Sequence, residues 1–329
     1  MRTLLITDIH LNAKTPGLLE AQVKCLTKLF RTEEYTDVII MGDVFMHRKP
    51  TPSELLAFRS ILDSIPEVPV VVIRGNHDSE TKADDGVTAL SVFDSLDVHV
   101  VTHTYTDKLK KRVYIPHYED EKIIKRNLSE VPKGYVVFGH FGFGGCLNSA
   151  GDADFSLPLS AFYNTTFLGH IHKFDQRAQA VQGSVETITV LGTPYTINFG
   201  EVGQEKYYAL LEETRVTFRS LTHGPRHLVY AAKDLESNLE HINDPTWFTM
   251  LRVTVDADHH PIPYDKLSVA SVDVKYNPVF NEENVSDYKP ERDLFSINEV
   301  IIEDYVDAAN STISKELLMG GYRLLKDED

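Results

Sequence analysis

The stretch Val70-Val-Val-Ile-Arg-Gly-Asn-His-Asp78 runs from a β-branched, apolar segment into a glycine and three polar residues. Such a short apolar run, bounded by turn residues, predicts a buried strand that ends near Ile73. Ligands of α/β sheets bind beyond the carboxyl ends of the strands. Asn, His and Asp at such a strand end can therefore be metal ligands, or they can form a simple turn, for which Asn and Asp are well suited.

The same arrangement recurs at four other places along the chain. Short apolar runs lead into the motifs Asp8-Ile-His10, Gly42-Asp43, Gly139-His140 and Gly169-His-Ile-His172. One such motif alone is usually a cap, a turn or a core feature. Five of them, each after an expected strand, predict that metal-binding types of side chain converge on one rim of the fold.

The spacing within these motifs supports one shared site. Asp8 and His10, like His170 and His172, are two residues apart and therefore lie on the same side of an extended segment. Glycine directly before Asp43 and before the first ligands of the later motifs lets the backbone approach the site closely. Carboxylate, amide and imidazole ligands together suit manganese, iron or zinc, with metal availability deciding among them.

The first 222 residues alternate between apolar, β-branched runs and helical stretches. Helices are expected over residues 18–30 and 52–62, and Thr51 and Glu54 form a capping-box pattern at the start of the second helix. This alternation predicts an α/β fold with layered sheets. The expected strands are residues 3–7, 38–41, 70–73, 98–101, 113–115, 135–138, 166–168, 188–191 and 207–211.

A different pattern begins after residue 222 and predicts a small α+β unit. Residues 277–292 are polar and contain proline, which indicates a linker. We therefore expect domains over 1–222 and 223–276, followed by that linker and by a helical segment over 293–329. Within the small unit the pattern predicts a helix over 234–241, a strand over 248–255, a short helix over 264–267 and a strand over 271–275.

The helical segment at the end of the chain carries an apolar stripe. Ser296 and Glu299 form a capping-box pattern at the start of its first helix. Such a stripe usually packs on its own domain, but its position after a polar linker favours docking to a partner. The stripe consists of Ile297, Val300, Ile301 and Tyr305.

The charge of the chain is strongly acidic. It has 33 basic and 49 acidic residues, a net charge of -16, and the last third, residues 223–329, carries 10 basic and 21 acidic residues. A general basic surface for nucleic acid is therefore absent, and DNA affinity would need local patches, bound metal ions or a partner. The candidate phosphate contacts, for which a solvated charged face is the simpler interpretation, are Lys108, Lys110, Lys111 and Arg112.

Several other functions and locations are disfavoured by the sequence. The two cysteines, Cys25 and Cys146, cannot form a disulfide framework and lie in no Cys-x-x-Cys pattern, so we expect inert packing residues. No run approaches the roughly 20 apolar residues of a membrane span, and the N-terminal run is too short for a signal peptide. We expect a cytoplasmic protein without membrane contact.

The ordered set of five motifs resembles the calcineurin-like metallophosphoesterase superfamily, over about residues 1–200. Two further stretches, Gly42-Asp-Val-Phe-Met-His-Arg-Lys-Pro50 and Leu191-Gly-Thr-Pro-Tyr-Thr196, are similar to the SbcD branch of DNA double-strand-break repair nucleases. Within that branch the resemblance is greatest to the small, nuclease subunit of T-even-type phage recombination endonucleases. It implies a β-sandwich metallophosphoesterase core flanked by helices, with the small α+β unit as a capping and DNA-binding domain.

The resemblance also implies two divalent metal ions, with manganese as the first choice and magnesium, iron or zinc as alternatives. Such a pair of ions activates water for attack on phosphorus and neutralises the charge that develops there. The resemblance assigns to His77 the protonation of the leaving sugar oxygen. One ion would bind Asp8, His10, Asp43 and His172, and the other would bind Asp43, Asn76, His140 and His170.

The chain departs from the resembled nucleases at Met46. Those enzymes usually place a second functional histidine three residues after the bridging Asp, whereas here His47 follows one position later. His47 either replaces that histidine or is a surface residue.

The resemblance predicts a two-metal DNA nuclease subunit that acts as an exonuclease on duplex ends, as an endonuclease, or as both, in DNA recombination, repair or replication. It predicts an SbcC-like ABC-type ATPase as partner, whose coiled coil would bind the stripe of residues 297–305. It also suggests a homodimer in which the helix over 52–62 is a contact, unless that helix packs on the sheet.

Two alternatives stay open at this point. A small-molecule phosphodiesterase or phosphatase of the same superfamily would carry the same metal motifs. The absence of the Asp-Arg-Gly ending of phosphoprotein phosphatases and the 107 residues after the core count against it. A non-catalytic scaffold that tethers a partner would have lost ligands, whereas all seven ligand positions are filled.

Overall fold

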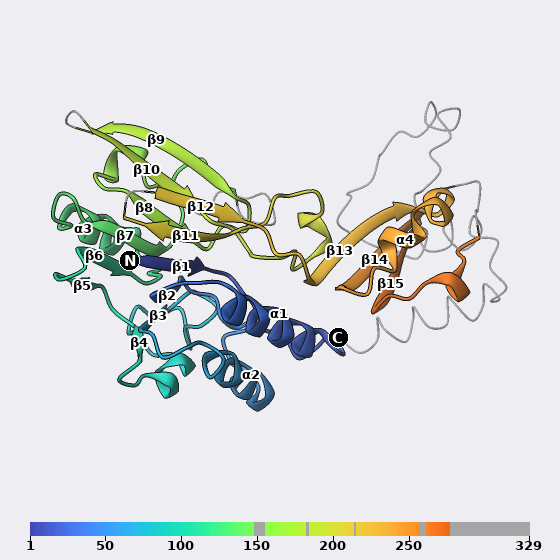
Figure 1. Cartoon of the computed structure of the whole chain (residues 1–329). Helices are drawn as coiled ribbons and strands as arrows, with labels where there is room; N and C mark the ends of the chain where they lie inside the picture. The colour runs from blue at the N-terminus through green and yellow to red at the C-terminus, as the bar shows by residue number, and fades with distance from the viewer. Residues whose placement is uncertain (148–154, 182–183, 214, 257–260, 277–329) are drawn as a thin grey trace, which may run out of the picture. The chain divides into compact units, whose positions relative to one another are not determined.

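The computed structural model describes residues 1–147, 155–181, 184–213, 215–256 and 261–276. Two six-stranded sheets and one three-stranded sheet account for the strands of this part (Figure 1). The stripe residues Ile297, Val300, Ile301 and Tyr305 lie outside the described residues, as does the expected linker. No helix within the described ranges is long and apolar enough to cross a membrane.

The first sheet has the strand order β12-β11-β1-β2-β3-β4. Strands β1 to β4 run parallel, and β11 is antiparallel to both of its neighbours. The carboxyl ends of β1, β2 and β3 therefore meet at one edge, as the motif pattern requires. The bounds are β1 (Arg2–Ile6), β2 (Asp37–Ile40), β3 (Val70–Ile73), β4 (Val98–Val101), β11 (Tyr208–Glu212) and β12 (Arg215–Arg219).

The second sheet has the order β5-β6-β7-β8-β10-β9. Its four central strands are parallel, and the two edge strands are antiparallel to them. The edge strands β5 and β9 escaped the sequence prediction because their residues are largely exposed and polar. The strand β12 was also not predicted, although its partly buried Val216 and Phe218 alternate with polar residues. The bounds are β5 (Tyr105–Asp107), β6 (Arg112–Ile115), β7 (Val136–His140), β8 (Thr166–Gly169), β9 (Asp175–Val181) and β10 (Ser184–Val190).

The two large sheets share one buried apolar cluster. Leu5 of β1 and Ile39 of β2 belong to it together with Phe138 of β7 and Phe167 of β8. Because side chains alternate along a strand, the neighbours of these residues on β1 and β2 face the opposite side. The sheets are thus packed face to face, which confirms the prediction of an α/β fold with layered sheets.

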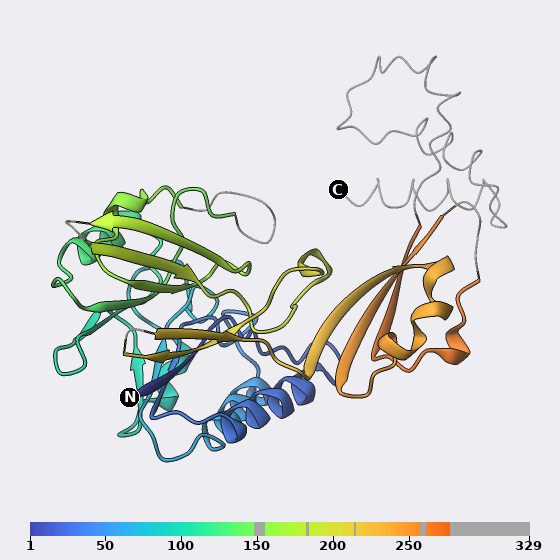
Figure 2. The same cartoon turned by 45° about the horizontal axis from the view of Figure 1, so that its top comes forward.

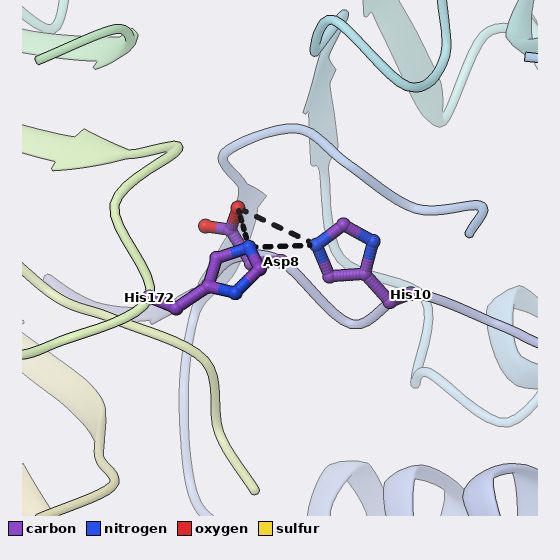
Figure 3. Close-up of side chains that lie close together, drawn as sticks. All are labelled: Asp8, His10 and His172. Carbon is purple, nitrogen blue, oxygen red and sulfur yellow. Dashed lines mark hydrogen bonds and ion pairs between the residues drawn. The ribbon is translucent and has the colours of Figure 1, made fainter. Parts of the chain in front are cut away.

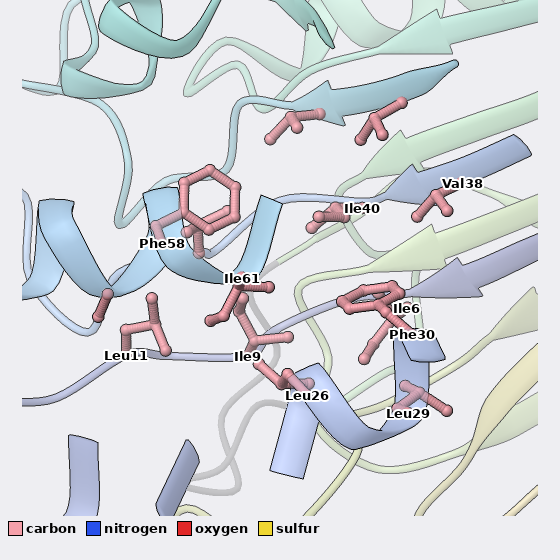
Figure 4. Close-up of a cluster of buried hydrophobic side chains, with 14 of the residues drawn as sticks. Ile6, Ile9, Leu11, Leu26, Leu29, Phe30, Val38, Ile40, Phe58 and Ile61 are labelled. Atoms are coloured by element: carbon pink, nitrogen blue, oxygen red, sulfur yellow. The ribbon is translucent and has the colours of Figure 1, made fainter. Parts of the chain in front are cut away.

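Helices cover the outer face of each sheet. On the first sheet, Ile6 and Ile40 pack against Leu26, Phe58 and Ile61 of two helices (Figure 4). On the second sheet a third helix and a short 3-10 turn close the other side. The helices are α1 (Leu18–Thr32), α2 (Pro52–Leu62) and α3 (Glu121–Ser129), and the 3-10 turns of this part are η1 (Ala89–Phe93), η2 (Leu159–Ala161) and η3 (Phe199–Glu201).

The helix α2 begins and ends where the sequence predicted. Thr51 and Glu54 form the complete capping box, with each side chain bonded to the backbone N–H of the other residue. Phe58 and Ile61 are fully buried against the sheet, whereas Leu56 on the outer face is 71% exposed. The helix therefore packs on the sheet, and a homodimer contact through its outer face stays a prediction.

The small unit is a parallel three-stranded sheet in the order β13-β14-β15 (Figure 2). Leu235 and Ile242 pack on Leu251 and Val253 of its central strand. The helix predicted over 234–241 was wrong in extent, because the chain forms three short turns there, and β13 was not predicted. The bounds are β13 (Gly224–Ala231), η4 (Ala232–Asp234), η5 (Glu236–Asn238), α4 (Leu239–Ile242), β14 (Trp247–Val255), η6 (Tyr264–Lys266) and β15 (Ser271–Tyr276).

Candidate metal centre

The carboxyl ends of the strands bring the predicted ligands together from both large sheets. The ligand atoms within each of two groups lie within 4.8 Å of one another. Asp8 and Asp43 follow strands of the first sheet, whereas His140, His170 and His172 come from the ends of β7 and β8. The two groups are Asp8, His10 and His172, and Asp43, His140 and His170.

The backbone at the ligands differs from the extended conformation that the two-residue spacing suggested. Asp8, His10 and Asp43 have φ of 51°, 44° and 49°, and His170 has φ of 82°. Non-glycine residues rarely adopt this left-handed region, and such strain concentrates at functional sites. Asp8 and His10 therefore converge because the chain leaves the strand in this conformation. The predicted convergence is correct, but an extended backbone is not its cause.

Two glycines show why the chain can close around the site. A Cβ atom at Gly42, where φ is 93°, would collide with the imidazole of His140. A Cβ atom at Gly75 would collide with the carboxylate and the backbone N–H of Asp43. Close backbone approach at these positions requires glycine, as the sequence predicted.

The first group surrounds the carboxylate of Asp8 (Figure 3). The Nε2 atoms of His10 and His172 are 3.1 Å apart, and each is 3.9 Å from Oδ1 of Asp8. Asp8 and His10 are almost fully buried, whereas His172 is partly exposed. The three potential ligand atoms therefore lie close enough together to bind one metal ion.

The second group includes the amide of Asn76. Its Oδ1 atom lies 3.2 Å from Nε2 of His140 and 2.9 Å from Nδ1 of His170. Nδ1 of His140 lies 2.6 Å from the carbonyl oxygen of Met41, which can only accept, so Nδ1 carries a proton. Nε2 of His140 is thereby directed at the site.

Asp43 lies between the two groups. Its Oδ1 atom is 3.3 Å from Nε2 of His140, and its Oδ2 atom is 3.8 Å from Nε2 of His10. Each oxygen of one carboxylate thus faces a different group. This is the geometry that a shared ligand of two ions needs.

The electrostatics of the site fit a bound cation. Asp8 and Asp43 are 0% and 1% exposed, and among the described residues no lysine or arginine forms an ion pair with either. Burial raises the pKa of Asp8, and burial also lowers the pKa of His10 to about 3, so this imidazole is neutral. Buried carboxylates need compensating charge. Two carboxylates facing imidazole and amide ligands fit divalent ions in chemistry as well as in geometry.

His140 and His172 are the exceptions among these imidazoles. Burial would lower both pKa values, but the hydrogen bond with Glu201 raises the pKa of His172, and the charge of Asp43 raises that of His140 to about 9. The same attraction outweighs burial at Asp43 and lowers its pKa well below the usual value. In the absence of metal, a proton on His140 therefore supplies part of the missing positive charge. Metal binding at this group would have to displace that proton.

His77 lies beside the first group but is not part of it. Its ring is 5.1 Å from the ring of His10, and its backbone N–H donates to Oδ1 of Asp43. Nδ1 of the ring lies 2.7 Å from the carbonyl oxygen of Met46. The carbonyl fixes Nδ1 as a donor, and the ring is partly exposed. His77 can thus present Nε2 to a substrate.

Met46, which stands where the resembled nucleases usually place a second histidine, contributes through its backbone. Met46 holds His77 by its carbonyl group, as described above. The neighbouring His47 is half-buried and makes no hydrogen bond or ion pair with any other described residue. Its catalytic role stays a prediction.

Asp78 completes the motif as a structural anchor. Its carboxylate accepts hydrogen bonds from the backbone N–H groups of Val44, Phe45 and Gly75. Burial and the charge of Asp43 raise the pKa of Asp78 to about 7. Asp78 therefore ties the loop after β2 to the loop after β3, a role that its sequence context does not reveal.

Sequence reasoning missed His117. It is 6% exposed, and its ring stacks at 5.5 Å on the ring of His170. Burial lowers the pKa of His117 to about 3. The uncharged ring of His117 therefore packs behind the second group, against His170. No motif surrounds it in the sequence, so only the fold reveals this position.

The predicted DNA contacts lie at the end of the second sheet that is opposite the metal ligands. Lys108 and Lys111 are exposed in the turn between β5 and β6, before the first residue of β6. Since β6 is parallel to β7, this turn is at the end opposite His140. Arg112 is 4% exposed and pairs with Asp37, and Lys110 lies 3.3 Å from the same carboxylate. Arg112 is thus an interior residue, and its assignment as a DNA contact conflicts with its burial.

Both cysteines are buried and unpaired, as predicted. Burial raises the pKa of Cys25 to about 12 and also raises that of Cys146. Neither thiol is therefore a nucleophile at neutral pH.

Comparison with known families identifies the first half of the chain. The model of the calcineurin-like phosphoesterase family matches residues 1–174. The chain belongs to this family. Its members are phosphoesterases, and both ligand groups described above lie entirely within the matched region.

Individual known proteins give weaker similarity to this phosphoesterase. No curated protein matches the chain. Among solved structures, the nuclease MPE of Pseudomonas putida is 18% identical, with a TM-score of 0.31, over 66% of this chain and 87% of that one. The purple acid phosphatase PPD1 from yellow lupin (Lupinus luteus) seeds is 13% identical, with a TM-score of 0.43, over 68% of this chain and 52% of that one.

Proposed function

We propose that this phosphoesterase is a two-metal-dependent DNA nuclease subunit that hydrolyses phosphodiester bonds. The observation that carries hydrolysis is the position of Asp43, whose two oxygens face different ligand groups. A pair of ions held there would activate water and stabilise the charge that develops on phosphorus. The partly exposed ligands Asn76, His170 and His172 leave one side of the site open to a substrate.

The chain's own residues supply positioning and proton transfer in this proposal. Asp8, His10 and His172 hold one ion, Asn76, His140 and His170 hold the other, and Asp43 is shared. His77 is fixed by the carbonyl of Met46. In its imidazolium form it donates the Nε2 proton to the leaving sugar oxygen and becomes the neutral ring that keeps its proton on Nδ1. Manganese is the first choice of metal.

DNA as substrate rests on the two stretches that resemble repair nucleases, residues 42–50 and 191–196. Phosphodiesters of DNA and small diesters require the same chemistry, so the metal centre alone does not distinguish them. We further propose an SbcC-like ATPase as partner, docked on the stripe of residues 297–305. Such a partner would supply the basic surface that this acidic chain lacks.

The deciding experiment measures cleavage of an end-labelled DNA duplex and of bis-p-nitrophenyl phosphate with manganese. Wild type is compared with His77→Ala, after calorimetry has shown that the variant still binds two ions. His99→Ala is the matched control, because His99 is an exposed histidine on β4 that contacts no ligand. Loss of DNA cleavage in the His77 variant alone supports the nuclease and the role of His77.

Other outcomes separate the alternatives. If only the small diester is cleaved, the assay is repeated with an SbcC-like ATPase. Inactivity on DNA even then overturns the nuclease and favours the small-molecule phosphodiesterase. If neither substrate is cleaved although two ions bind, the scaffold alternative gains.

A matching substitution tests His47. His47→Ala is expected to reduce DNA cleavage if His47 replaces the second histidine of the resembled nucleases. Wild-type rates on both substrates would make it a surface residue.

A further inference from the structure

A buried glutamate lies directly behind the metal-ligand candidate His172. Glu201, the last residue of η3, is 1% exposed. Its Oε1 atom lies 2.9 Å from Nδ1 of His172 and also accepts a hydrogen bond from Nδ2 of Asn198 at 3.1 Å. The ring of His172 is thus held on the side that faces away from the metal-ligand group.

The second carboxylate oxygen of Glu201 also accepts several hydrogen bonds. Its Oε2 atom accepts hydrogen bonds from Nζ of Lys206 at 2.7 Å, from Oγ1 of Thr193 at 3.1 Å and from the backbone N–H of Ile197 at 3.2 Å. Nζ of Lys206 also donates to the carbonyl oxygen of His172 at 3.0 Å. The same ammonium group therefore binds both the carboxylate and the backbone of the ligand.

These contacts determine which ring nitrogen of His172 carries a proton. Both oxygens of Glu201 accept hydrogen bonds from other groups, and one of these donors is the ammonium group of Lys206 at 2.7 Å. A carboxylate that is paired with an ammonium group and accepts at both oxygens has no proton to donate, so Nδ1 of His172 must be the donor. Nε2 is then the atom that faces Oδ1 of Asp8 at 3.9 Å.

We propose that Glu201 is the positioning residue for His172, holding the imidazole in the orientation and tautomer that place Nε2 in the metal site. This inference rests on the metal-dependent function proposed above. A carboxylate bonded to the outer nitrogen of a ligating histidine fixes the ring and increases the basicity of the ligand. Burying the charged groups of Glu201 and Lys206 costs free energy. Both groups bond to His172, so their burial serves to position this one ligand.

The loop that carries Glu201 is itself held from its outer side. Oγ1 of Thr196 accepts a hydrogen bond from the backbone N–H of His227 at 2.7 Å. The ring of Phe199 packs edge to face on His227 at 4.7 Å, and the guanidinium of Arg252 lies 4.1 Å from the centre of the same ring. Two strands, β13 and β14, thus fix the segment that presents the carboxylate.

The test is the binding of manganese to Glu201→Gln, measured by calorimetry. The amide keeps the size of the side chain but cannot accept from His172 and Lys206 together. One of the two ions should bind about 10- to 100-fold more weakly. The other ion should keep its affinity, because Glu201 bonds to His172 of the first group, whereas the proposed ligands of that ion are Asn76, His140 and His170.

Glu54→Gln is the matched control. Glu54 is 2% exposed and accepts from the backbone N–H groups of Thr51 and Ala13, but it contacts no ligand. This variant should lose stability and keep both manganese affinities. A common loss of affinity in both variants would mean that any buried glutamate matters, which overturns the specific role of Glu201.

A second measurement on the unmodified protein keeps the proposal testable if Glu201→Gln does not fold. Two-bond proton–nitrogen NMR correlations of the metal-free wild type, assigned with His172→Ala, should show a proton on Nδ1 of His172. A ring protonated on Nε2 alone, or wild-type manganese affinities in Glu201→Gln, would refute the role. Failure of wild type to cleave DNA would instead reject the nuclease and leave these binding results unchanged.

Discussion

The two ends of strand β2 each carry a buried aspartate, and the two carboxylates have opposite surroundings. Asp37 is the first residue of β2 and is 3% exposed, while Asp43 follows the last residue and is 1% exposed. Asp37 pairs with the guanidinium of Arg112 and lies 3.3 Å from Nζ of Lys110. Asp43 is faced by imidazoles, and no lysine or arginine in the described part of the chain pairs with it.

The difference separates a structural carboxylate from a ligand. Burial would raise the pKa of Asp37, but attraction to Arg112 lowers it below the usual value. Its charge is therefore neutralised by the chain itself. At the other end, Asp8 and Asp43 are faced by imidazoles, which can give up a proton and bind a metal ion, and not by lysine or arginine. A buried aspartate thus indicates a metal site when its partners are themselves potential metal ligands.

The largest expected effect is at the metal end. Asp43→Asn keeps the shape of the side chain and removes the shared charge. Because bound metal contributes several kcal/mol to the transition state, hydrolysis of bis-p-nitrophenyl phosphate should fall by about a thousandfold or more. Initial rates with manganese check this, with circular dichroism to confirm folding. A variant that keeps a tenth of wild-type activity would show that Asp43 is no ligand.

At the opposite end, Arg112→Met should destabilise the protein without affecting chemistry. It leaves Asp37 buried without its main partner, and breaking a buried pair costs about 3 to 5 kcal/mol. Urea unfolding checks the free energy, and activity per folded molecule should equal that of wild type. The double variant Asp37→Asn with Arg112→Met should recover part of the stability. A loss of manganese affinity in Arg112→Met would contradict the distinction between a structural Asp37 and a metal-binding Asp43.

The stability that manganese adds to the protein should depend on Asp43 at the metal end and not on Arg112 at the opposite end. A ligand that binds only the folded state contributes about 2.7 kcal/mol at a hundredfold excess over its Kd. Wild type and Arg112→Met should both gain stability of this order with manganese, whereas Asp43→Asn should gain much less. Thermal unfolding with manganese or with a chelator measures the gain. Equal gains in all three proteins would place the ions elsewhere.

Acid should weaken the Asp37 end in a defined range of pH. The pKa of Asp37 lies below its ordinary value of 3.8 in the folded state, so its contribution is complete above that value. It is lost as pH falls through the folded-state pKa. The difference in unfolding free energy between wild type and Asp37→Asn, measured with chelator from pH 7 to pH 3, should be constant and then shrink below about pH 4. A difference that grows on acidification would contradict the ion pair.

The smallest effect is expected for the exposed lysines of the β5–β6 turn. Lys108→Ser with Lys111→Ser should change DNA affinity by less than about twofold, since the turn lies opposite the metal ligands and exposed charges are well screened. The salt dependence of binding is the sharper measure. A slope reduced by about one for each lysine would restore both residues as phosphate contacts.

The metal ligands were predictable because the signal is local. Each motif follows directly after an apolar strand, and parallel strands deliver their carboxyl ends to one edge whatever the rest of the chain does. The same reasoning located α2 and most central strands. It missed β5 and β9, where exposed polar residues hide the strand pattern. It also missed β12, and it misplaced the turns of residues 232–242.

Residues that act at a distance left no such signal. Glu201 meets His172 across 29 positions, and Arg112 meets Asp37 across 75. A lone glutamate after a turn and a basic residue in a charged run look the same in sequence whether they are buried or exposed. His117 likewise acquires its place behind His170 only when β6 and β8 are assembled into one sheet.

The sequence by itself determined which side chains reach the edge of the sheets, because strand ends and glycine turns are decided by neighbouring residues. The tertiary structure alone decided how charge is distributed among them. It gave Asp37 an arginine, left Asp43 facing imidazoles, turned each oxygen of Asp43 toward a different group and placed Glu201 behind His172. Burial and electrostatic compensation depend on residues far apart in the chain, so only the assembled fold could fix them.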